Sequence, residues 1–529
     1  MRNVCKILAI YAASLISSAM LTGCRQAQPE SGPKVRIAVA HKEHPESGLD
    51  SYYEAWLEEK SGLEIEFVPI PESYTYEYLR LLLSGESNGI DAVFFTEDYY
   101  MTPETLEFYG DKGMLMPLEP YIERKNSEIA TIIEQFDRFD LHRAMEDARG
   151  HIYYMPALDT SRMLAHSQVL WMNLEWLEEQ KLPFPRDTDS FREVLRQFSQ
   201  AYPEGVPLLG SMETSGTSVI YFLMNAFTVC DPANGYMAVE NGTVFFAPLT
   251  DRWREGLSYC HDLYTEGLLP DEVFTFSKDQ LSGMVNDSRN LVGCFCAKSI
   301  SDVLSEQSSD VLNRYLVLPP LNSREQRGIS VPETKLPRPG GVILSGSAYG
   351  EEIFSLMDLM CTEEAYLAGH YGEQGKDWNF AAPSDISAFG EPAVITIRNQ
   401  EWYQKSGRVS GTMGPYVVRE KYADGISWVG YQINQSAYMN ARAYKLYKSY
   451  QPPEYLTAVL FRGQDAYLEN YIMDVVNYTK DCMKDFITGA RDIHDDAVWE
   501  AYCKGFDTMQ IEALMQAAVK AGWNTGENE

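Results

Sequence analysis

Apolar and polar positions in the first part of the chain change between two periodicities, which predicts alternating strands and helices. Residues 35–40 (VRIAVA) form a short apolar run, residues 49–61 carry apolar side chains at helical spacing, and residues 63–68 (LEIEFV) alternate with period two. A second helical pattern over residues 76–83 leads to the apolar run 91–95 (DAVFF). This strand–helix–strand–helix–strand order predicts a parallel sheet covered by helices.

Loops at the carboxyl ends of parallel strands are where such a sheet collects its ligands. In this chain the loops begin at His41, Pro69 and Thr96. None of the three carries the glycine-rich sequence that cradles a phosphate. The sheet is therefore expected to serve a ligand other than a nucleotide.

The part of the chain after about residue 351 is mostly helical by pattern. Apolar residues recur at intervals of three and four over residues 467–486 and again over residues 497–518. A chain of 529 residues exceeds what one hydrophobic core usually organises, so at least two domains are expected. With 45% hydrophobic and 12% aromatic residues, the composition excludes a disordered protein.

The amino-terminal segment has the order of a secretory signal peptide. Residues 1–23 have a short basic start, an apolar middle and a close in Leu-Thr-Gly. Cys24 follows directly, and this arrangement resembles the lipobox of bacterial lipoproteins, in which cleavage leaves an acylated cysteine as the first residue. The apolar run is shorter than the roughly 20 residues that span a bilayer. Residues 24–33 are therefore expected to be a lipidated cysteine and a flexible polar tether that hold the protein at the bacterial cell membrane, outside the cytosol.

The charge of the chain limits its partners. Asp and Glu number 76 against 44 Lys and Arg, which gives a formal net charge of -32. Nucleic acid and anionic lipid headgroups would be repelled by such a surface. We interpret the acidity as a property that keeps an exported protein soluble.

The cysteines do not form the pattern of a disulfide framework. After Cys24 there are seven, an odd number scattered along the chain: Cys230, Cys260, Cys294, Cys296, Cys361, Cys482 and Cys503. The pair in the apolar run LVGCFCA is typical of a buried strand, and no second Cys or His pair stands nearby at the spacing of a zinc site.

Sequence signatures of enzymes are missing. The chain has no Gly-x-Ser-x-Gly elbow and no His-Glu-x-x-His pair. Adjacent acids such as Glu58-Glu59 and Glu351-Glu352 point in different directions on a helix, so they are typical of solvated faces rather than of glycosidase carboxylates. The stretch Asp187-Thr188-Asp189 lacks the glycine and the terminal glutamate of a calcium loop. We predict neither an enzyme, nor a metal site, nor a cofactor.

Six short motifs follow one another in a recognisable order. They are residues 56–68 (WLEEKSGLEIEFV), 113–118 (GMLMPL), 150–156 (GHIYYMP), 170–177 (LWMNLEWL), 264–269 (YTEGLL) and 371–378 (YGEQGKDW). In this order the chain resembles the extracellular solute-binding proteins of ABC importers, specifically the large lipoprotein branch of the family that binds carbohydrates (family 1). The resemblance extends over residues 35–523, nearly the whole body of the chain.

The resemblance implies an α/β fold of the type II periplasmic-binding-protein kind. Two lobes of parallel-type sheets flanked by helices would be joined by crossing strands around a ligand cleft, with a helical carboxyl-terminal extension. By this analogy lobe I comprises residues 34–155 plus 285–345, and lobe II comprises residues 156–284 plus 346–529. The crossings are expected near residues 155–160, 283–290 and 340–346.

Aromatic rings stand beside carboxylates and arginines in the loops at the expected lobe edges. Sugars need this mixture, because they present apolar C–H faces together with rings of hydroxyl groups. The candidate ligand-binding residues are Tyr74, Glu97, Asp98, Tyr99, Asp159, Arg162, Asp377, Trp378, Trp402, Trp428 and Tyr431. Other tryptophans sit inside helix-like or strand-like patterns and are expected in the core: Trp56, Trp171, Trp176, Trp253 and Trp499.

The function that the resemblance implies is the extracytoplasmic substrate-binding component of an ABC importer. The protein would capture an oligosaccharide or another sugar between its lobes and deliver it to permease subunits in the membrane. It would act as a monomer, contact the membrane through its lipid anchor and bind no nucleic acid. Two alternatives stay open: a peptide-binding lipoprotein of an ABC importer, and an exported glycan-cleaving enzyme.

Overall fold

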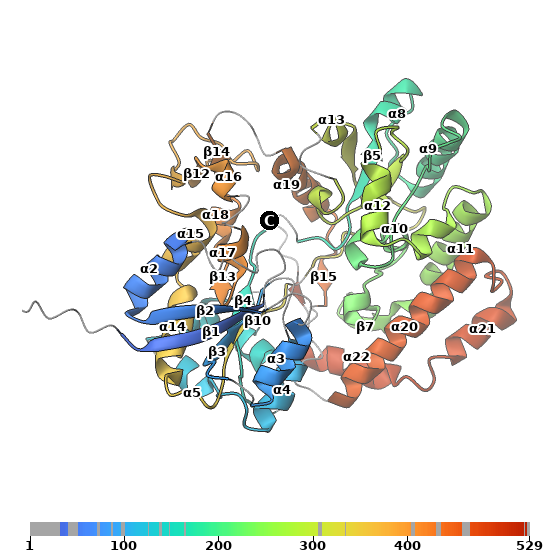
Figure 1. The fold of residues 1–529 in the computed structure, drawn as a ribbon. Helices are drawn as coiled ribbons and strands as arrows, with labels where there is room; N and C mark the ends of the chain where they lie inside the picture. Colours follow the sequence, from blue (N-terminus) through green and yellow to red (C-terminus); the bar gives the residue numbers. More distant parts are fainter. Residues whose placement is uncertain are drawn as a thin grey trace, which may run out of the picture.

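The protein folds into two lobes that lie side by side, each around its own buried core (Figure 1). The computed structural model describes residues 32–40, 51–70, 75–85, 88–96, 101–124, 126–136, 140–147, 149–162, 165–304, 309–333, 335–403, 408–429, 435–456, 466–522 and 524–525. The two-lobed α/β fold expected from the motif order is confirmed.

The sheet of the first lobe starts as the periodicity predicts. Strand β1 (Lys34–Ala40) pairs in parallel with β2 (Glu64–Ile70) and with β3 (Ala92–Phe94). Ile37 is opposite Phe67 on one side and Ala92 on the other, and it is fully buried. A continuous apolar run is what a strand needs when both faces of its sheet are covered.

Three later strands complete this sheet. They are β4 (Met155–Leu158), β10 (Arg338–Ile343) and β13 (Tyr416–Val417), and the order is β13-β4-β10-β3-β1-β2. Strand β10 runs antiparallel to both β3 and β4. At Gly340 a Cβ atom would lie 2.7 Å from the carbonyl oxygen of Gly414, so this backbone contact leaves no room for a side chain.

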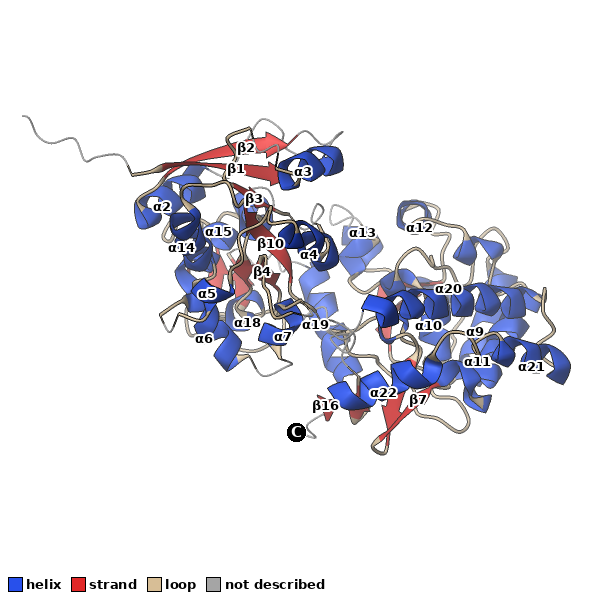
Figure 2. Cartoon of the chain, turned by 90° about the horizontal axis from the view of Figure 1, so that it is seen from below, coloured by secondary structure: helices blue, strands red, loops and turns tan. Residues whose placement is uncertain are grey.

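Helices cover both faces of the first lobe's sheet (Figures 1 and 2). One face carries α2 (Ser51–Ser61), α14 (Gly350–Met360) and α15 (Glu363–Tyr371), and the other carries α3 (Thr75–Leu83) and α4 (Pro103–Asp111). The shorter helices of this lobe are α5 (Glu119–Ile122), α6 (Glu128–Gln135) and α7 (Leu141–Met145).

A small second sheet packs beside the first lobe's large sheet. Its strands are β11 (Trp378–Phe380), β12 (Ile395–Ile397) and β14 (Ile426–Trp428), in the order β11-β12-β14. The associated helices are α16 (Gln400–Trp402), α17 (Arg408–Thr412) and α18 (Glu420–Ala423). Ile395 and Ile426 share a buried cluster with Ala157 of β4, which joins this unit to the first lobe. The sequence pattern favoured helices here, because strands of three residues are too short to establish a period.

The second lobe is built on a three-stranded antiparallel sheet. Strand β5 (Leu170–Asn173) lies between β8 (Cys294–Cys296) and β9 (Tyr315–Leu318). Both cysteines of β8 are buried, as the run LVGCFCA predicts. A hairpin of β6 (Met237–Glu240) and β7 (Thr243–Phe246) lies apart from this sheet.

Most of the second lobe is helical. Its helices are α8 (Leu174–Glu179), α9 (Thr188–Ala201), α10 (Val219–Met224), α11 (Asp251–Thr265), α12 (Lys278–Val285), α13 (Ser309–Leu312), α19 (Gln435–Lys448), α20 (Ala466–Thr488), α21 (Asp496–Lys504) and α22 (Ile511–Ala521). The helical repeats predicted over 467–486 and 497–518 are confirmed, the second as two helices. Helix α20 packs along α11, and the short pair β15 (Glu454–Tyr455) and β16 (Asn524–Thr525) lies near the end of the chain.

The division of the chain between the lobes differs from the one expected. Strands β8 and β9, expected in lobe I as part of residues 285–345, pair with β5 in the second lobe. Helices α14 and α15, expected in lobe II as part of residues 346–529, pack in the first lobe. A short apolar strand or an amphipathic helix has the same sequence pattern on either body, so the pattern could not assign these segments.

The positions of the crossings between the lobes also differ from those expected. The first begins after β4, at the position expected near residues 155–160, and ends at β5. The second lies between β9 and β10, and the third lies between β14 and α19. The crossings expected near residues 283–290 and 340–346 are therefore wrong, because these residues lie within single lobes.

Candidate functional site

Two of the crossing segments are held together by a partly buried ion pair. The Lys335 ammonium, between β9 and β10, lies 2.6 Å from the Asp159 carboxylate, which directly follows β4. The same ammonium also donates to the hydroxyl oxygen of Ser161 at 3.0 Å. Burial alone would raise the pKa of Asp159, but the Lys335 charge and the Ser161 hydrogen bonds outweigh it and lower that pKa. Asp159 is thus a charged anchor for the second crossing segment.

Arg162 ties the same region to the small sheet of the first lobe. Its Nε donates to Asp424 at 2.8 Å and its Nη2 donates to Glu391 at 3.1 Å. The guanidinium lies 4.6 Å from the ring centre of Phe389 and 6.0 Å from that of Tyr444 on α19. Arg162 therefore sits where the first lobe meets a helix of the second.

Asp424, the main partner of Arg162, is almost completely buried. Its side chain is 2% exposed, and burial raises its pKa even though Arg162 acts in the opposite direction. One carboxylate oxygen accepts from Arg162, while the other has no hydrogen-bond partner among the described residues. Such a group depends strongly on the single cation beside it.

A third ion pair continues the series into the second lobe. Lys298, which follows β8, is paired with Glu333 of the second crossing segment. We call the three pairs Lys298–Glu333, Lys335–Asp159 and Arg162–Asp424 the interlobe ion pairs. They run from the second lobe across two crossing segments to the small sheet of the first lobe.

A buried histidine adds a neutral contact between the same segments. His166, which is 2% exposed, has its Nδ1 3.0 Å from the Ser330 hydroxyl and its Nε2 3.3 Å from the carbonyl oxygen of Tyr444. Burial lowers the pKa of His166 to about 4, so the ring is neutral at pH 7. It links the first crossing segment, the second crossing segment and α19.

Asp377 and Trp378 are buried, although both were expected to contact a ligand in the cleft. Trp378 is 3% exposed, and its indole N–H donates to the carbonyl oxygen of Gly372 at 2.9 Å. Asp377 is 2% exposed and accepts from the Glu373 N–H and from the Asn399 amide. Their hydrogen bonds fix the turn before β11 and the start of α16. The expectation that the Trp378 ring faces a cleft is therefore wrong.

Trp402 and Trp428 fit the expected role better, because both are only half-buried. Trp428 ends strand β14, and its indole nitrogen has no hydrogen-bond partner among the described residues. Two exposed apolar side chains stand at the ends of strands in the same small sheet: Val429 after β14 and Phe380 in β11. Because β11 runs antiparallel to β12, Phe380 lies at the opposite end of the sheet from Trp428. The end of the sheet that carries Trp428 and Val429 therefore offers aromatic and apolar surface to a ligand.

The remaining candidates lie outside the described residues. These are the ligand candidates Tyr74, Glu97, Asp98, Tyr99 and Tyr431, together with the lipidation candidate Cys24. Of the tryptophans expected in the core, Trp171, Trp176 and Trp253 are buried, whereas Trp56 and Trp499 are half-buried.

Lys335 and Asp424 are residues that the sequence reasoning missed. Lys335 lies 176 positions from Asp159, and Asp424 lies 262 positions from Arg162. No local pattern marks either residue, since each contact depends on how the crossing segments pass one another.

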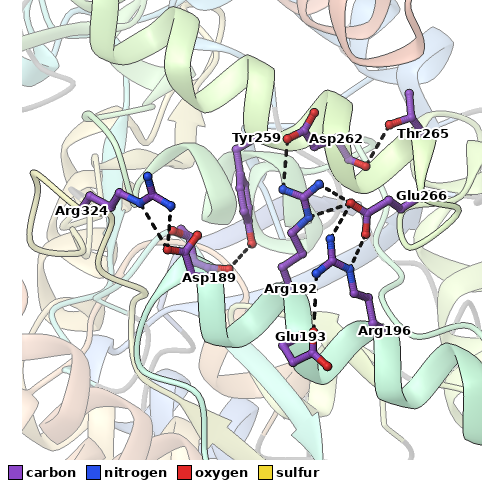
Figure 3. Close-up of polar contacts among 10 residues, drawn as sticks. Asp189, Arg192, Glu193, Arg196, Tyr259, Asp262, Thr265, Glu266 and Arg324 are labelled. Carbon is purple, nitrogen blue, oxygen red and sulfur yellow. Dashed lines mark hydrogen bonds and ion pairs between the residues drawn. The ribbon is translucent and has the colours of Figure 1, made fainter.

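A separate polar group lies on the outer face of the second lobe (Figure 3). Arg192 and Arg196 of α9 both contact Glu266, which caps the end of α11, and Arg192 also contacts Asp262 at 3.0 Å. Hydrogen bonds from Arg196 and Arg192 lower the pKa of Glu266 to about 2. We call these four residues the outer-face ion pairs. They hold α9 and α11 together, and neither helix contains a candidate ligand residue.

The described residues give no sign of a metal centre or of a membrane-spanning helix. Within the described ranges, no group of three or more His, Cys, Asp or Glu side chains is arranged to hold a metal ion. None of the helices in these ranges combines the length and the apolarity that crossing a bilayer requires.

The chain is similar in sequence and in structure to known substrate-binding proteins of ABC transporters. No protein-family model matches the chain. Over 177 residues the chain is 26% identical to the fructooligosaccharide ABC transporter substrate-binding protein FusA of Streptococcus pneumoniae. This match covers 31% of the chain and about a third of the relative's length, 32%.

Similarity in three dimensions extends over nearly the whole chain. An EF-hand mutant of S. pneumoniae FusA in complex with fructo-nystose has a TM-score of 0.70 at 18% identity, covering 92% of this chain and 98% of FusA. An HMO binding, ABC-transporter associated solute binding protein from Bifidobacterium longum infantis has a TM-score of 0.70 at 16% identity, covering 93% and 99%. The alginate-binding protein AlgQ2 has a TM-score of 0.62 at 15% identity, covering 93% and 98%. The chain therefore has the fold of these solute-binding proteins.

Proposed function

We propose that this protein is the substrate-binding component of an ABC importer and that it captures an oligosaccharide between its lobes. The observation that carries the proposal is the fold, which proteins that bind fructooligosaccharides and HMO share over more than nine-tenths of the chain. The 177-residue sequence match to FusA points to the same class of protein. A sugar held between two lobes would be released to permease subunits when the lobes separate.

The ligand would be held at the end of the small sheet where β12 and β14 finish. Trp428 and Trp402 supply half-buried rings there, and the interlobe ion pairs set the distance between the lobes. Asp159 and Arg162 then act by positioning the lobes, because their charged groups already have protein partners. The candidates Tyr74, Glu97, Asp98, Tyr99 and Tyr431 remain proposed ligand contacts.

The proposed location is the outer surface of the cell membrane. Substrate-binding components of ABC importers work outside the cytoplasm, and Cys24 would supply the lipid anchor at the end of a signal peptide. Replacing Cys24 by Ser should release or mislocalise the protein. Variant protein that fractionates with membranes as the original does would contradict the anchor.

Calorimetry with a panel of oligosaccharides tests the function, and two tryptophan variants sharpen it. Trp428→Ala should weaken binding several-fold with little change in melting temperature, because stacking a ring on a sugar contributes about 1 kcal/mol. Trp378→Ala is the matched control: its ring is buried, so it should cost about 3–5 kcal/mol of stability.

Three outcomes would redirect the proposal. Binding of peptides without binding of any oligosaccharide would indicate a peptide importer. Release of sugars from a polysaccharide by the purified protein would indicate an enzyme. Unchanged affinity in Trp428→Ala would remove this end of the small sheet from the site while leaving the sugar-binding function intact.

A further inference from the structure

The second lobe contains a pocket of about 470 Å³ that lies apart from the interlobe ion pairs. Three segments form most of its walls: the β6–β7 hairpin, residues 326–329 of the second crossing segment, and residues 450–454 after α19. Its volume is in the range of small-molecule sites. None of the candidate ligand residues lines it.

Two aromatic rings in the pocket are each accompanied by an arginine. The Arg252 guanidinium lies 5.6 Å from the ring centre of Phe245, and that of Arg327 lies 4.8 Å from the ring centre of Tyr450. Arg252 also donates to both carboxylate oxygens of Glu240, at 2.9 and 3.2 Å. Aromatic faces beside guanidinium groups, which donate hydrogen bonds in pairs, suit a ligand with both apolar C–H faces and hydroxyl groups.

The charges of the pocket cancel. Two carboxylates, Glu240 and Glu454, face two guanidinium groups, Arg252 and Arg327. An anion would meet the carboxylates and a cation would meet the guanidinium groups, so neither gains from entering. The balance favours a neutral polar ligand.

Two amide side chains in the pocket are free to bind such a ligand. Among the residues that the structure describes, the side chains of Asn241 and Gln451 have no hydrogen-bond partner, and both line the pocket. Each amide offers a donor and an acceptor at once, which matches the hydroxyl groups of a sugar. The two come from different walls, the hairpin turn and the segment after α19.

The walls are fixed by backbone hydrogen bonds, so the pocket is formed in advance. Ile329 N–H donates to the carbonyl oxygen of Asn225 at 2.9 Å, and Ser330 N–H donates to that of Tyr450 at 2.9 Å. Gly242 N–H donates to the Glu454 carboxylate at 2.9 Å, which ties the hairpin turn to another wall. When the walls of a site are already ordered, less conformational entropy is lost on ligand binding.

We propose that this pocket is a second saccharide site, on the second lobe, for a neutral mono- or disaccharide. Phe245 and Tyr450 provide the apolar faces, and Asn241 and Gln451 bind hydroxyl groups. The site goes beyond the proposed capture of an oligosaccharide between the lobes and does not depend on it, since neither the candidate ligand residues nor the interlobe ion pairs line it.

The test uses the complete mature chain with sucrose, maltose and lactose as probes. Crystals soaked in each sugar should show it between Phe245 and Tyr450, and ligand-observed NMR should give its affinity. The double variant Asn241→Ala, Gln451→Ala should weaken binding about fivefold or more, since it removes two hydrogen-bonding groups. Ile329→Trp, which fills the pocket, should abolish binding there.

Two controls separate this site from the one between the lobes. Gln516→Ala on α22 removes an exposed amide elsewhere and should change nothing, and Trp428→Ala should leave sugar in the pocket unaffected. Absence of all three sugars from the pocket, or equal affinity in the double variant and the Gln516 control, would overturn the proposal. Neither result would bear on binding between the lobes.

Discussion

The interlobe ion pairs and the outer-face ion pairs use the same chemistry in different surroundings. Arg162 approaches Asp424 to 2.8 Å, and Arg196 approaches Glu266 to 2.7 Å. The Asp424 side chain is only 2% exposed, whereas that of Glu266 is 27% exposed. Geometry alone would rank the two contacts as equals.

Burial reverses the direction in which the pKa of the carboxylate shifts. At Asp424 the loss of water is the largest influence and raises the pKa, although Arg162 is bound to it. At Glu266 the hydrogen bonds from Arg196 and Arg192 are the larger influence and lower the pKa to about 2. Removing a cation should therefore destabilise the protein strongly at the interlobe ion pairs and only slightly on the outer face.

The largest effect should come from Arg162→Ala, which leaves the Asp424 carboxylate buried without a cation. We expect a loss of about 3–5 kcal/mol in the free energy of unfolding, measured by chemical denaturation at pH 7. The double variant Arg162→Ala, Asp424→Asn should recover much of that loss, because no charge is then stranded. A double variant no more stable than Arg162→Ala would mean that the arginine stabilises the junction by packing on Phe389.

Lys335→Ala should have a smaller effect of the same kind. Its partner Asp159 has a side chain that is 34% exposed, so water can replace part of the lost interaction. We expect a loss of about 2–3 kcal/mol, less than for Arg162→Ala. An oligosaccharide affinity that changes together with stability would indicate that this pair also sets the distance between the lobes.

His166 should make the buried region sensitive to mild acid. Its pKa is about 4 in the folded protein against an ordinary value of 6.5, so the unfolded chain binds the proton first as the pH falls. Stability should therefore drop between pH 6.5 and pH 4, by about 2 kcal/mol from pH 7 to pH 5. His166→Gln should remove its own share of this slope and leave that of His370, whose pKa burial also lowers to about 4. His494→Gln, at an exposed position, should keep the whole slope.

The smallest effect should be that of Glu266→Gln on the outer face. We expect less than about 1 kcal/mol at pH 7, and less still in high salt, which screens exposed charges. The folded pKa of Glu266 lies below its ordinary value, so its contribution is present above about pH 4.5 and is lost as the pH falls toward 2. A loss as large as that of Arg162→Ala would remove the distinction between the two groups.

Local patterns predicted the elements better than their assembly. The period-two run at residues 63–68 is β2, the helical repeat at 467–486 lies in α20, and the run LVGCFCA contains β8. Each of these patterns depends only on residues close together in the sequence, so it can be recognised without knowing the tertiary contacts. The small sheet escaped prediction because strands of three residues are too short to show a period.

The candidate site was predicted only in part, for the same reason. Trp378 and Trp428 both stand among polar residues in the sequence, yet the first is buried and the second half-buried. The difference arises from hydrogen bonding within the turn that precedes β11, where Gly372 accepts from the Trp378 indole. Residue type identifies tryptophans that could stack on a sugar. It does not predict which of the two rings is buried in the core.

The sequence by itself determined the alternation of strands and helices, the parallel start of the first sheet and the two-lobed fold, because periodicity and motif order are properties of the chain. Tertiary structure alone decided which lobe each segment joins and which charges meet. Asp424 and Arg162 are 262 positions apart, and Lys335 and Asp159 are 176 apart. Contacts at such separations depend on the paths of the crossing segments, and only the folded chain fixes those paths.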